Sequence, residues 1–164
     1  MRLFLAGLWG LAPLTAAAAQ ETADYKLYFP RSDHPSLGFE ERRIEKTGSL
    51  AGDVTAVVKA LAAGPRTGLK PALPPGRTLR QVFLGPDGTV FVDLAVAAGA
   101  ASLGVQDEAL SLWAIVNTLG DNFSEVKAVK VLLGGDEAPD YFGHLDISRP
   151  LQPDHSLVEK DGGR

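Results

Sequence analysis

Apolar and polar residues alternate in two short runs between residues 79 and 95, on either side of Pro86-Asp87-Gly88. The runs are rich in β-branched and aromatic residues, and an Asp-Gly pair between such runs is a strong hairpin signal. Pro86 supplies the fixed φ of the first turn position, and Gly88 takes a positive φ that a side chain resists. The pattern therefore predicts a β-hairpin with a three-residue loop at positions 86–88.

The loop length determines the register of the predicted hairpin. One face is then aliphatic and needs a core, whereas the other face carries an aromatic pair beside polar groups. A slip of one residue would mix the two faces. The predicted cross-strand pairs are Gln81–Asp93, Val82–Val92, Phe83–Phe91 and Leu84–Val90.

Two other segments carry apolar residues at helical spacing. Residues 49–63 form the first predicted helix, with Ser49 as its N-cap and Gly64-Pro65 as its stop. The second predicted helix runs from Asp107 to about residue 119 and ends at Gly120-Asp121-Asn122. The apolar stripes are Leu50, Val54, Val57, Val58 and Leu61 in the first helix and Ala109, Leu112, Ile115, Val116 and Leu119 in the second.

The remaining strand patterns complete the predicted architecture. Residues 25–29 are typical of a strand ended by Pro30, residues 39–47 of a second strand or a charged ribbon, and residues 126–133 of a strand. Residues 141–151 are predicted to be an ordered loop or short strand that returns to the sheet. Each helix has one apolar stripe and the hairpin has one aliphatic face. We therefore predict an α+β fold in which a small mixed β-sheet has two helices packed on one face.

Both ends of the chain are predicted to lie outside this single domain of residues 24–151. Residues 1–19 have a charged start at Arg2, an apolar run and a small-residue cleavage site, which together predict a cleavable signal peptide. An uncleaved membrane anchor is the alternative, although the apolar run is short for a membrane span. Residues 152–164 are polar and are predicted to be a disordered tail.

The cysteine content and the charge bear on the destination of the protein. The 164-residue chain has no cysteine, so it has neither structural disulfides nor the cysteine that a lipoprotein signal places at its cleavage site. We therefore expect a periplasmic or secreted protein. The formal net charge of −4, without a basic stripe, gives no reason to expect nucleic acid as a partner.

The titratable residues form no recognisable catalytic or metal-binding motif. Asp93 has no partner at a fixed spacing, and we expect it to hydrogen-bond across the hairpin to Gln81. The three histidines lack the spacing of metal ligands, and no thiolate can complete a site. We therefore predict no catalytic residue, no metal and no cofactor. The alternative is a periplasmic hydrolase-type enzyme in which two of Asp93, His144 and Asp146 act as acid and base.

Six segments, in this order, resemble the GerMN domain, the family of sporulation and spore-germination proteins. The resemblance as a whole covers about residues 25–151. They are LAAGP at 61–65, LPPGRTL at 73–79, DGTVFVDLA at 87–95, LSLWAIVNTL at 110–119, VKAVKVLLG at 126–134 and GHLDISRPL at 143–151.

The resemblance implies a non-enzymatic, extracytoplasmic scaffold or binding module of the cell envelope, with a fold similar to ring-building motifs. Such a module would act through contacts with an envelope protein, a cell-wall ligand or another copy of itself. This chain has one copy of the domain where the sporulation protein carries two, and it lacks a lipid-anchor cysteine. The resemblance therefore implies the module and not a sporulation pathway.

The hairpin offers one candidate surface for such a contact. The Phe83–Phe91 pair is either covered by the returning segment 141–151, through Tyr141 or Phe142, or exposed to a partner. The sequence leaves both alternatives open.

The second helix offers another candidate surface. The positions predicted to face outward are Leu110, Ala114, Asn117 and Asp121, an unusually apolar set for a solvated face. Two structural alternatives apply to this set. Residues 96–104 could fold over Leu110, and Asn117 could bridge to the following loop.

Overall fold

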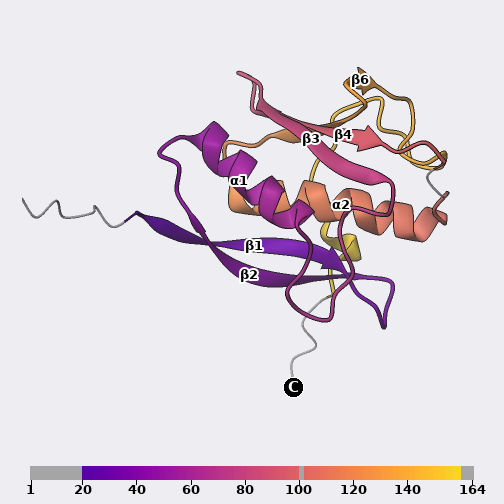
Figure 1. The fold of residues 1–164 in the computed structure, drawn as a ribbon, viewed down its shortest axis with the longest axis horizontal. Coiled ribbons are helices and arrows are strands. Elements are labelled where there is room, and N and C mark those ends of the chain that lie inside the picture. Colours follow the sequence, from indigo (N-terminus) through magenta and orange to yellow (C-terminus); the bar gives the residue numbers. More distant parts are fainter. Residues whose placement is uncertain (1–19, 100–101, 160–164) are drawn as a thin grey trace, which may run out of the picture.

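The computed structural model describes residues 20–99 and 102–159, so the predicted signal peptide at 1–19 lies outside the described residues. Two helices lie between two β-sheets (Figure 1). The elements are β1 (Thr22–Pro30), β2 (Leu37–Glu45), α1 (Leu50–Ala62), β3 (Arg77–Leu84), β4 (Thr89–Val96), α2 (Val105–Asn122), β5 (Ala128–Leu133), β6 (Asp136–Glu137) and a 3-10 turn, η1 (His155–Leu157).

The larger sheet has the strand order β3-β4-β5-β6. β3 and β4 are antiparallel, β4 and β5 are parallel, and β5 and β6 are antiparallel, so the sheet is mixed. Val90, Val92 and Val131 are fully buried on the face that the helices cover. The predicted α+β fold, with two helices on one face of a mixed sheet, is confirmed.

β1 and β2 form a separate antiparallel sheet that covers the helices from the other side (Figure 1). The side chains of Leu27 and Phe29, which belong to β1 of this sheet, are fully buried. Residues 39–47 were predicted to be a strand or a charged ribbon. The structure has the strand β2 here, which begins two residues earlier than predicted, at Leu37, and ends at Glu45. The sequence pattern does not predict this second layer, because β1 and β2 pair locally and periodicity does not tell which sheet a strand joins.

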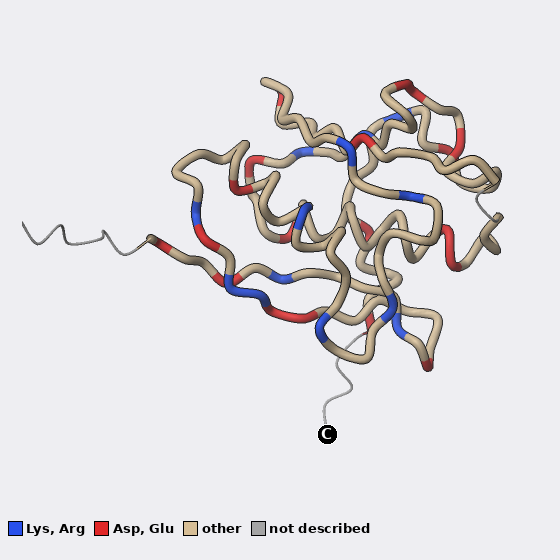
Figure 2. The backbone as a smooth tube through the Cα atoms, in the orientation of Figure 1, with Lys and Arg blue, Asp and Glu red and all other residues tan. Residues whose placement is uncertain are grey.

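Charged residues of both signs are interspersed over the described backbone (Figure 2). On the two-stranded sheet they pair between neighbouring strands and the segments that flank them. Arg43 Nε lies 3.0 Å from Asp24 Oδ1, and Lys46 Nζ lies 2.8 Å from Glu21 Oε1. Exposed pairs of this kind contribute at most about 1 kcal/mol each, so the burial of Leu27 and Phe29 contributes more to holding this layer in place.

The predicted hairpin register is confirmed at all four cross-strand pairs. The loop closes as expected, with Gly85 N donating to Thr89 O at 2.8 Å and Gly88 N donating to Gly85 O at 3.1 Å. Gly88 has φ +85°, the left-handed conformation predicted for it. The register shifts once, at a bulge between Leu79 and Gln81.

The first helix begins and ends as its sequence predicts. Ser49 is the N-cap, and its Oγ accepts a hydrogen bond from Gly52 N at 3.2 Å. Gly64 follows the helix with φ +88°, and Pro65 prevents its continuation.

The second helix is longer than predicted at both ends. Gly104 rather than Asp107 is its N-cap, and the helix continues through Gly120-Asp121-Asn122, which was predicted to end it. The glycine serves a close contact instead of a helix stop, because a Cβ at Gly120 would lie 2.1 Å from Cγ of Pro153.

The expectation that this set of α2 residues faces outward holds only for Asp121, which is exposed, and is wrong for the other three. Leu110, Ala114 and Asn117 are all buried. The physical reason is the second sheet: β1 packs alongside α2 on the side away from the larger sheet, and the C-terminal segment adds to this cover. A helix enclosed in this way has no solvated face along most of its length, so an apolar set at these positions indicates core.

The edge of β1 is hydrogen-bonded to side chains of α2. Lys26 N donates to Asn122 Oδ1 at 2.9 Å, and Asn122 Nδ2 donates back to Lys26 O at 2.6 Å. Two residues further along β1, Tyr28 N donates to Thr118 Oγ1 at 2.9 Å. Two helical side chains thus replace a neighbouring strand and satisfy backbone groups that a free edge would expose.

Residues 152–159 are folded, so the predicted disordered tail is wrong for this part of the chain. Asn117 Nδ2 donates to Asp154 O, and Asn117 Oδ1 accepts from Asp154 N, both at 2.8 Å. Leu37 forms a parallel bridge with Val158. Asn117 therefore bridges to the C-terminal strap, residues 153–159, and not, as the alternative had it, to the loop that follows α2. Residues 160–164 lie outside the described residues.

Candidate binding surface

Phe83 lies on the face of the larger sheet that points away from the helices, and 46% of its surface is exposed. Its cross-strand partner Phe91 is half-buried, and Phe91 in turn pairs with Lys130 of β5. The three residues therefore form one row across β3, β4 and β5. The aromatic end of this row is open and contains one of the few large apolar side chains that are exposed among the described residues.

The other end of the row is covered by the segment that returns to the sheet. Lys130 is buried, and its Nζ donates to Ile147 O at 3.1 Å and to Ser148 O at 2.6 Å. It also lies 3.3 Å from Glu137 Oε2. The returning segment 141–151 thus covers β5 and leaves the Phe83 side of the face uncovered.

Tyr141 and Phe142, which were expected as a cover for the phenylalanine pair, pack elsewhere. Tyr141 is buried against α2, where its hydroxyl lies 3.2 Å from Ser111 Oγ. The Phe142 ring lies 4.0 Å from the guanidinium carbon of Arg77 at the start of β3. Of the two alternatives that the sequence leaves open, exposure is therefore the one found for Phe83.

The three residues of the hydrolase alternative each have hydrogen-bond partners outside this set. Asp93 is buried and accepts from Arg80 Nη1 at 2.9 Å and from Gly135 N at 2.8 Å, so the bond to Gln81 that we expected is not the one formed. Asp146 accepts from Ser148 N at 2.8 Å. Within the described residues, no hydrogen bond joins any two of Asp93, His144 and Asp146.

His144 instead has a partner that the sequence does not predict. Glu108, at the start of α2, is fully buried, and its Oε2 lies 2.6 Å from His144 Nδ1. Its Oε1 accepts three backbone hydrogen bonds, from Phe142 N at 3.0 Å, His144 N at 3.3 Å and Leu145 N at 2.8 Å. Both carboxylate oxygens are thus engaged in fixing the 142–145 loop to the helix.

The environment of Glu108 favours its charged form. Burial is the largest effect and raises the pKa of this carboxyl. The Leu145 N–H, the His144 side chain and the other backbone donors together outweigh burial, and the pKa lies below the ordinary value of 4.5. The sequence does carry a signal for this residue, because Glu108 falls four residues before Leu112 on the buried stripe of α2.

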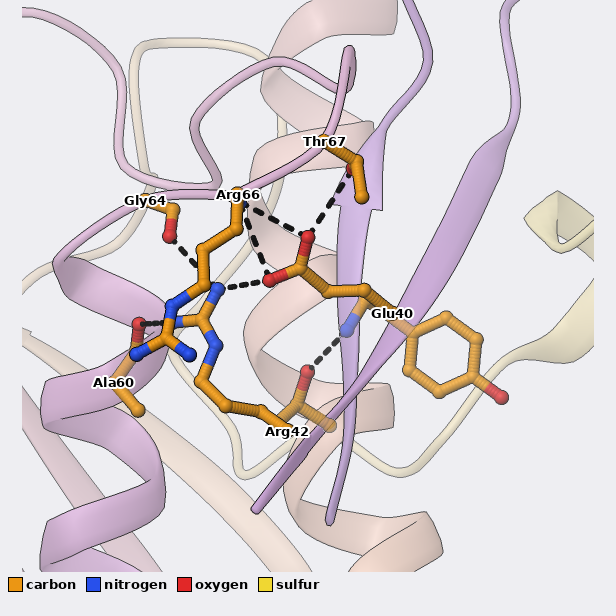
Figure 3. A network of polar contacts seen from close by, with 8 residues as sticks. Glu40, Arg42, Ala60, Gly64, Arg66 and Thr67 are labelled. Carbon is orange, nitrogen blue, oxygen red and sulfur yellow. Dashed lines mark hydrogen bonds and ion pairs between the residues drawn. The ribbon is translucent and has the colours of Figure 1, made fainter. Parts of the chain in front are cut away.

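A second buried charge network joins β2 to the end of α1 (Figure 3). Arg42 forms an ion pair with Glu40 and donates to two backbone oxygens, to Ala60 O at 2.7 Å and to Gly64 O at 3.1 Å. Glu40 also accepts from Arg66 N at 3.0 Å and from the hydroxyl of the next residue at 3.1 Å. The pair thus satisfies carbonyls at the C-terminus of α1 and fixes the loop that follows it.

The described residues contain no group of three or more His, Asp or Glu placed to hold a metal ion. No described helix has the length and apolar character needed to cross a membrane.

Several known structures have the same fold. A candidate lipoprotein from Clostridium perfringens matches 84% of this chain and 93% of its own, with 22% identity and a TM-score of 0.55. The first GerMN domain of the sporulation protein GerM from Bacillus subtilis matches 79% of this chain and 97% of its own, with 22% identity and a TM-score of 0.57. In the tandem GerMN domains of the same protein the match covers 80% of this chain but only 46% of the pair, with 22% identity and a TM-score of 0.61.

The family assignment is based on the sequence. No protein of curated function matches the chain significantly. The model of the Germane family, described as sporulation and spore germination, matches residues 26–139 and thus spans β1 to just beyond β6. The chain therefore belongs to the Germane family of sporulation and spore-germination domains.

Proposed function

We propose that this chain is a non-enzymatic, extracytoplasmic binding module of the cell envelope that contacts a protein partner through the Phe83 side of its larger sheet. The observation that carries the proposal is the exposure of Phe83 beside half-buried Phe91 on the face of the larger sheet that points away from the helices. A rigid sheet presents this aromatic group at a fixed position, and aromatic residues are enriched in the cores of protein interfaces.

The setting of the module is inferred from two further observations. The N-terminal 19 residues have the pattern of an export signal. A protein of the same fold is described as a candidate lipoprotein, and lipoproteins are attached to membranes outside the cytoplasm. The non-enzymatic part of the proposal is supported by the engagement of Asp93, Glu108 and His144 in structural contacts.

Site-specific photocrosslinking tests the contact. A photoreactive phenylalanine analogue at Phe83 is expected to give a discrete adduct in cells that produce the protein. The matched control is Phe39 of β2, an aromatic residue on the other sheet that is 41% exposed. The analogue at position 39 is expected not to give that adduct.

The identity of the adduct separates the possible partners. An adduct of twice the mass of the chain would identify another copy as the partner. An adduct that contains a second, different protein would identify an envelope protein. Equal labelling from positions 83 and 39, or no adduct from position 83, would contradict the proposal.

A further inference from the structure

A cavity of about 560 Å³ lies between the end of β1, the proline-rich segment 70–76, the start of β3 and the first turns of α2. It lies at a different place from the Phe83 face. Its wall is mainly apolar and includes Pro71, Leu73, Pro74 and Leu103. This volume is within the range of sites that hold small ligands, roughly 300–1,000 Å³.

Arg77 also lines this cavity and is only 8% exposed. Its guanidinium stacks on the ring of Phe142, and its Nη2 donates to Tyr141 O at 3.1 Å. Its Nε and Nη1 atoms are buried and have no hydrogen-bond partner. Among the described residues, no carboxylate forms an ion pair with this guanidinium.

Within the described part of the chain, the Arg77 guanidinium therefore lacks both a counter-charge and acceptors for two of its nitrogens. A buried cation is costly unless it is paired, and a buried donor without an acceptor adds to that cost. The other strongly buried arginine, Arg42, also has an Nε without a partner among the described residues, but its charge is paired with a carboxylate and its other nitrogens donate to two carbonyls. The group that best compensates a guanidinium is a carboxylate, which accepts in a bidentate manner and supplies the missing charge.

We propose that the proline-lined cavity binds a small amphipathic carboxylate, with its apolar body against the proline and leucine wall and its carboxylate toward Arg77. Charge at the rim favours an anion, because Lys70 and Arg77 line the cavity against one carboxylate, that of Asp107. The free donors of Arg77 are buried, so this binding mode requires the Phe142 ring, which stacks on the guanidinium, to move aside.

Titration followed by amide and aromatic NMR signals tests this proposal. The probe is 4-phenylbutyrate, and its uncharged control is 4-phenylbutyramide. The carboxylate is expected to bind at least tenfold more tightly, a difference of about 1.4 kcal/mol, and to shift signals of Leu103, Ser111 and Phe142. A short peptide with a C-terminal phenylalanine, tested as free acid and as amide, shows whether the natural source is a peptide end or a free acid.

Two variants locate the site. Arg77→Gln is expected to abolish the preference for the carboxylate over the amide. If this variant does not fold, Thr78→Trp provides the test, because Thr78 is an exposed lining residue of β3 and a large aromatic ring is tolerated on a strand surface. It is expected to weaken carboxylate binding at least tenfold by blocking the mouth. Equal binding of carboxylate and amide, or unchanged binding by folded Thr78→Trp, would overturn the proposal.

Discussion

Gly88 is subject to two constraints at once, and both exclude a side chain. Its φ is +85°, and a Cβ would lie 2.6 Å from the backbone oxygen of Glu125. Gly88→Val is therefore expected to lower the free energy of unfolding by at least about 2 kcal/mol, since positive φ alone costs an L-residue roughly 1–2 kcal/mol. Urea unfolding measures this loss. The control is Gly68→Ala, where a Cβ meets nothing within 4 Å and no change is expected.

Features such as Gly88 could be predicted because their causes are local. The turn, the register and the Ser49 cap depend on residues a few positions apart in the chain. The partners of the buried charges do not: Glu108 binds residues 34–37 positions away, and Glu40 binds a loop 26–27 positions away. Periodicity can place Glu108 on a buried stripe, but it gives no information about which distant backbone groups it accepts.

Glu108 also gives the fold a defined response to acid. Because its pKa in the folded state lies below 4.5, its charged form stabilises the protein above that pH, and the contribution is lost as the pH falls through the folded-state pKa. Glu108→Gln is therefore expected to be less stable than the wild type at about pH 7, and the difference is expected to shrink at about pH 3. Urea unfolding at both pH values measures the difference, and a gap that stays constant would contradict this assignment.

At the scale of elements, α2 shows how a correct pattern can lead to a wrong exposure. Four residues of its predicted stripe, Leu112, Ile115, Val116 and Leu119, are buried, and the fifth, Ala109, is half-buried. A prediction from one apolar stripe assumes that the opposite side of the helix faces water. Here β1 occupies that side, and Thr118 and Asn122 bond to its edge. A polar side chain in such a helix identifies the element it binds and does not indicate a solvated face.

Asn122 provides a test of this edge contact. Asn122→Ala removes both partners of the Lys26 backbone, so the free energy of unfolding is expected to fall by about 1–3 kcal/mol. Amide hydrogen exchange is the more specific measurement, because exchange at Lys26 N should accelerate while exchange at Tyr28 N, bonded to Thr118, changes less. Gln106→Ala, at an exposed position of the same helix, is the control and should leave both amides unchanged. Unchanged exchange at Lys26 in Asn122→Ala would show that the edge does not depend on this side chain.

At the scale of the molecule, the three layers depend on contacts between the two ends of the chain. β1 and the C-terminal strap, residues 153–159, both pack on α2, and the strap also meets β2 through Leu37. Composition alone predicts disorder for the strap because it is polar, yet its polar backbone is what Asn117 binds. The second layer could therefore not be predicted from apolar patterning. It is held by hydrogen bonds that connect segments about 37 to 96 positions apart.

Removal of the strap tests whether these contacts support the whole fold. A chain ending at Gln152 leaves the buried Asn117 amide without either of its Asp154 partners and exposes Leu37. Each orphaned group costs about 1–3 kcal/mol, so the expected loss is on the order of 3 kcal/mol and the melting temperature should fall by roughly 10 °C. A chain ending at Glu159 keeps the described strap and is the matched control, for which we expect no change. Equal melting temperatures of the two truncated chains would show that the strap lies on a fold that is stable without it.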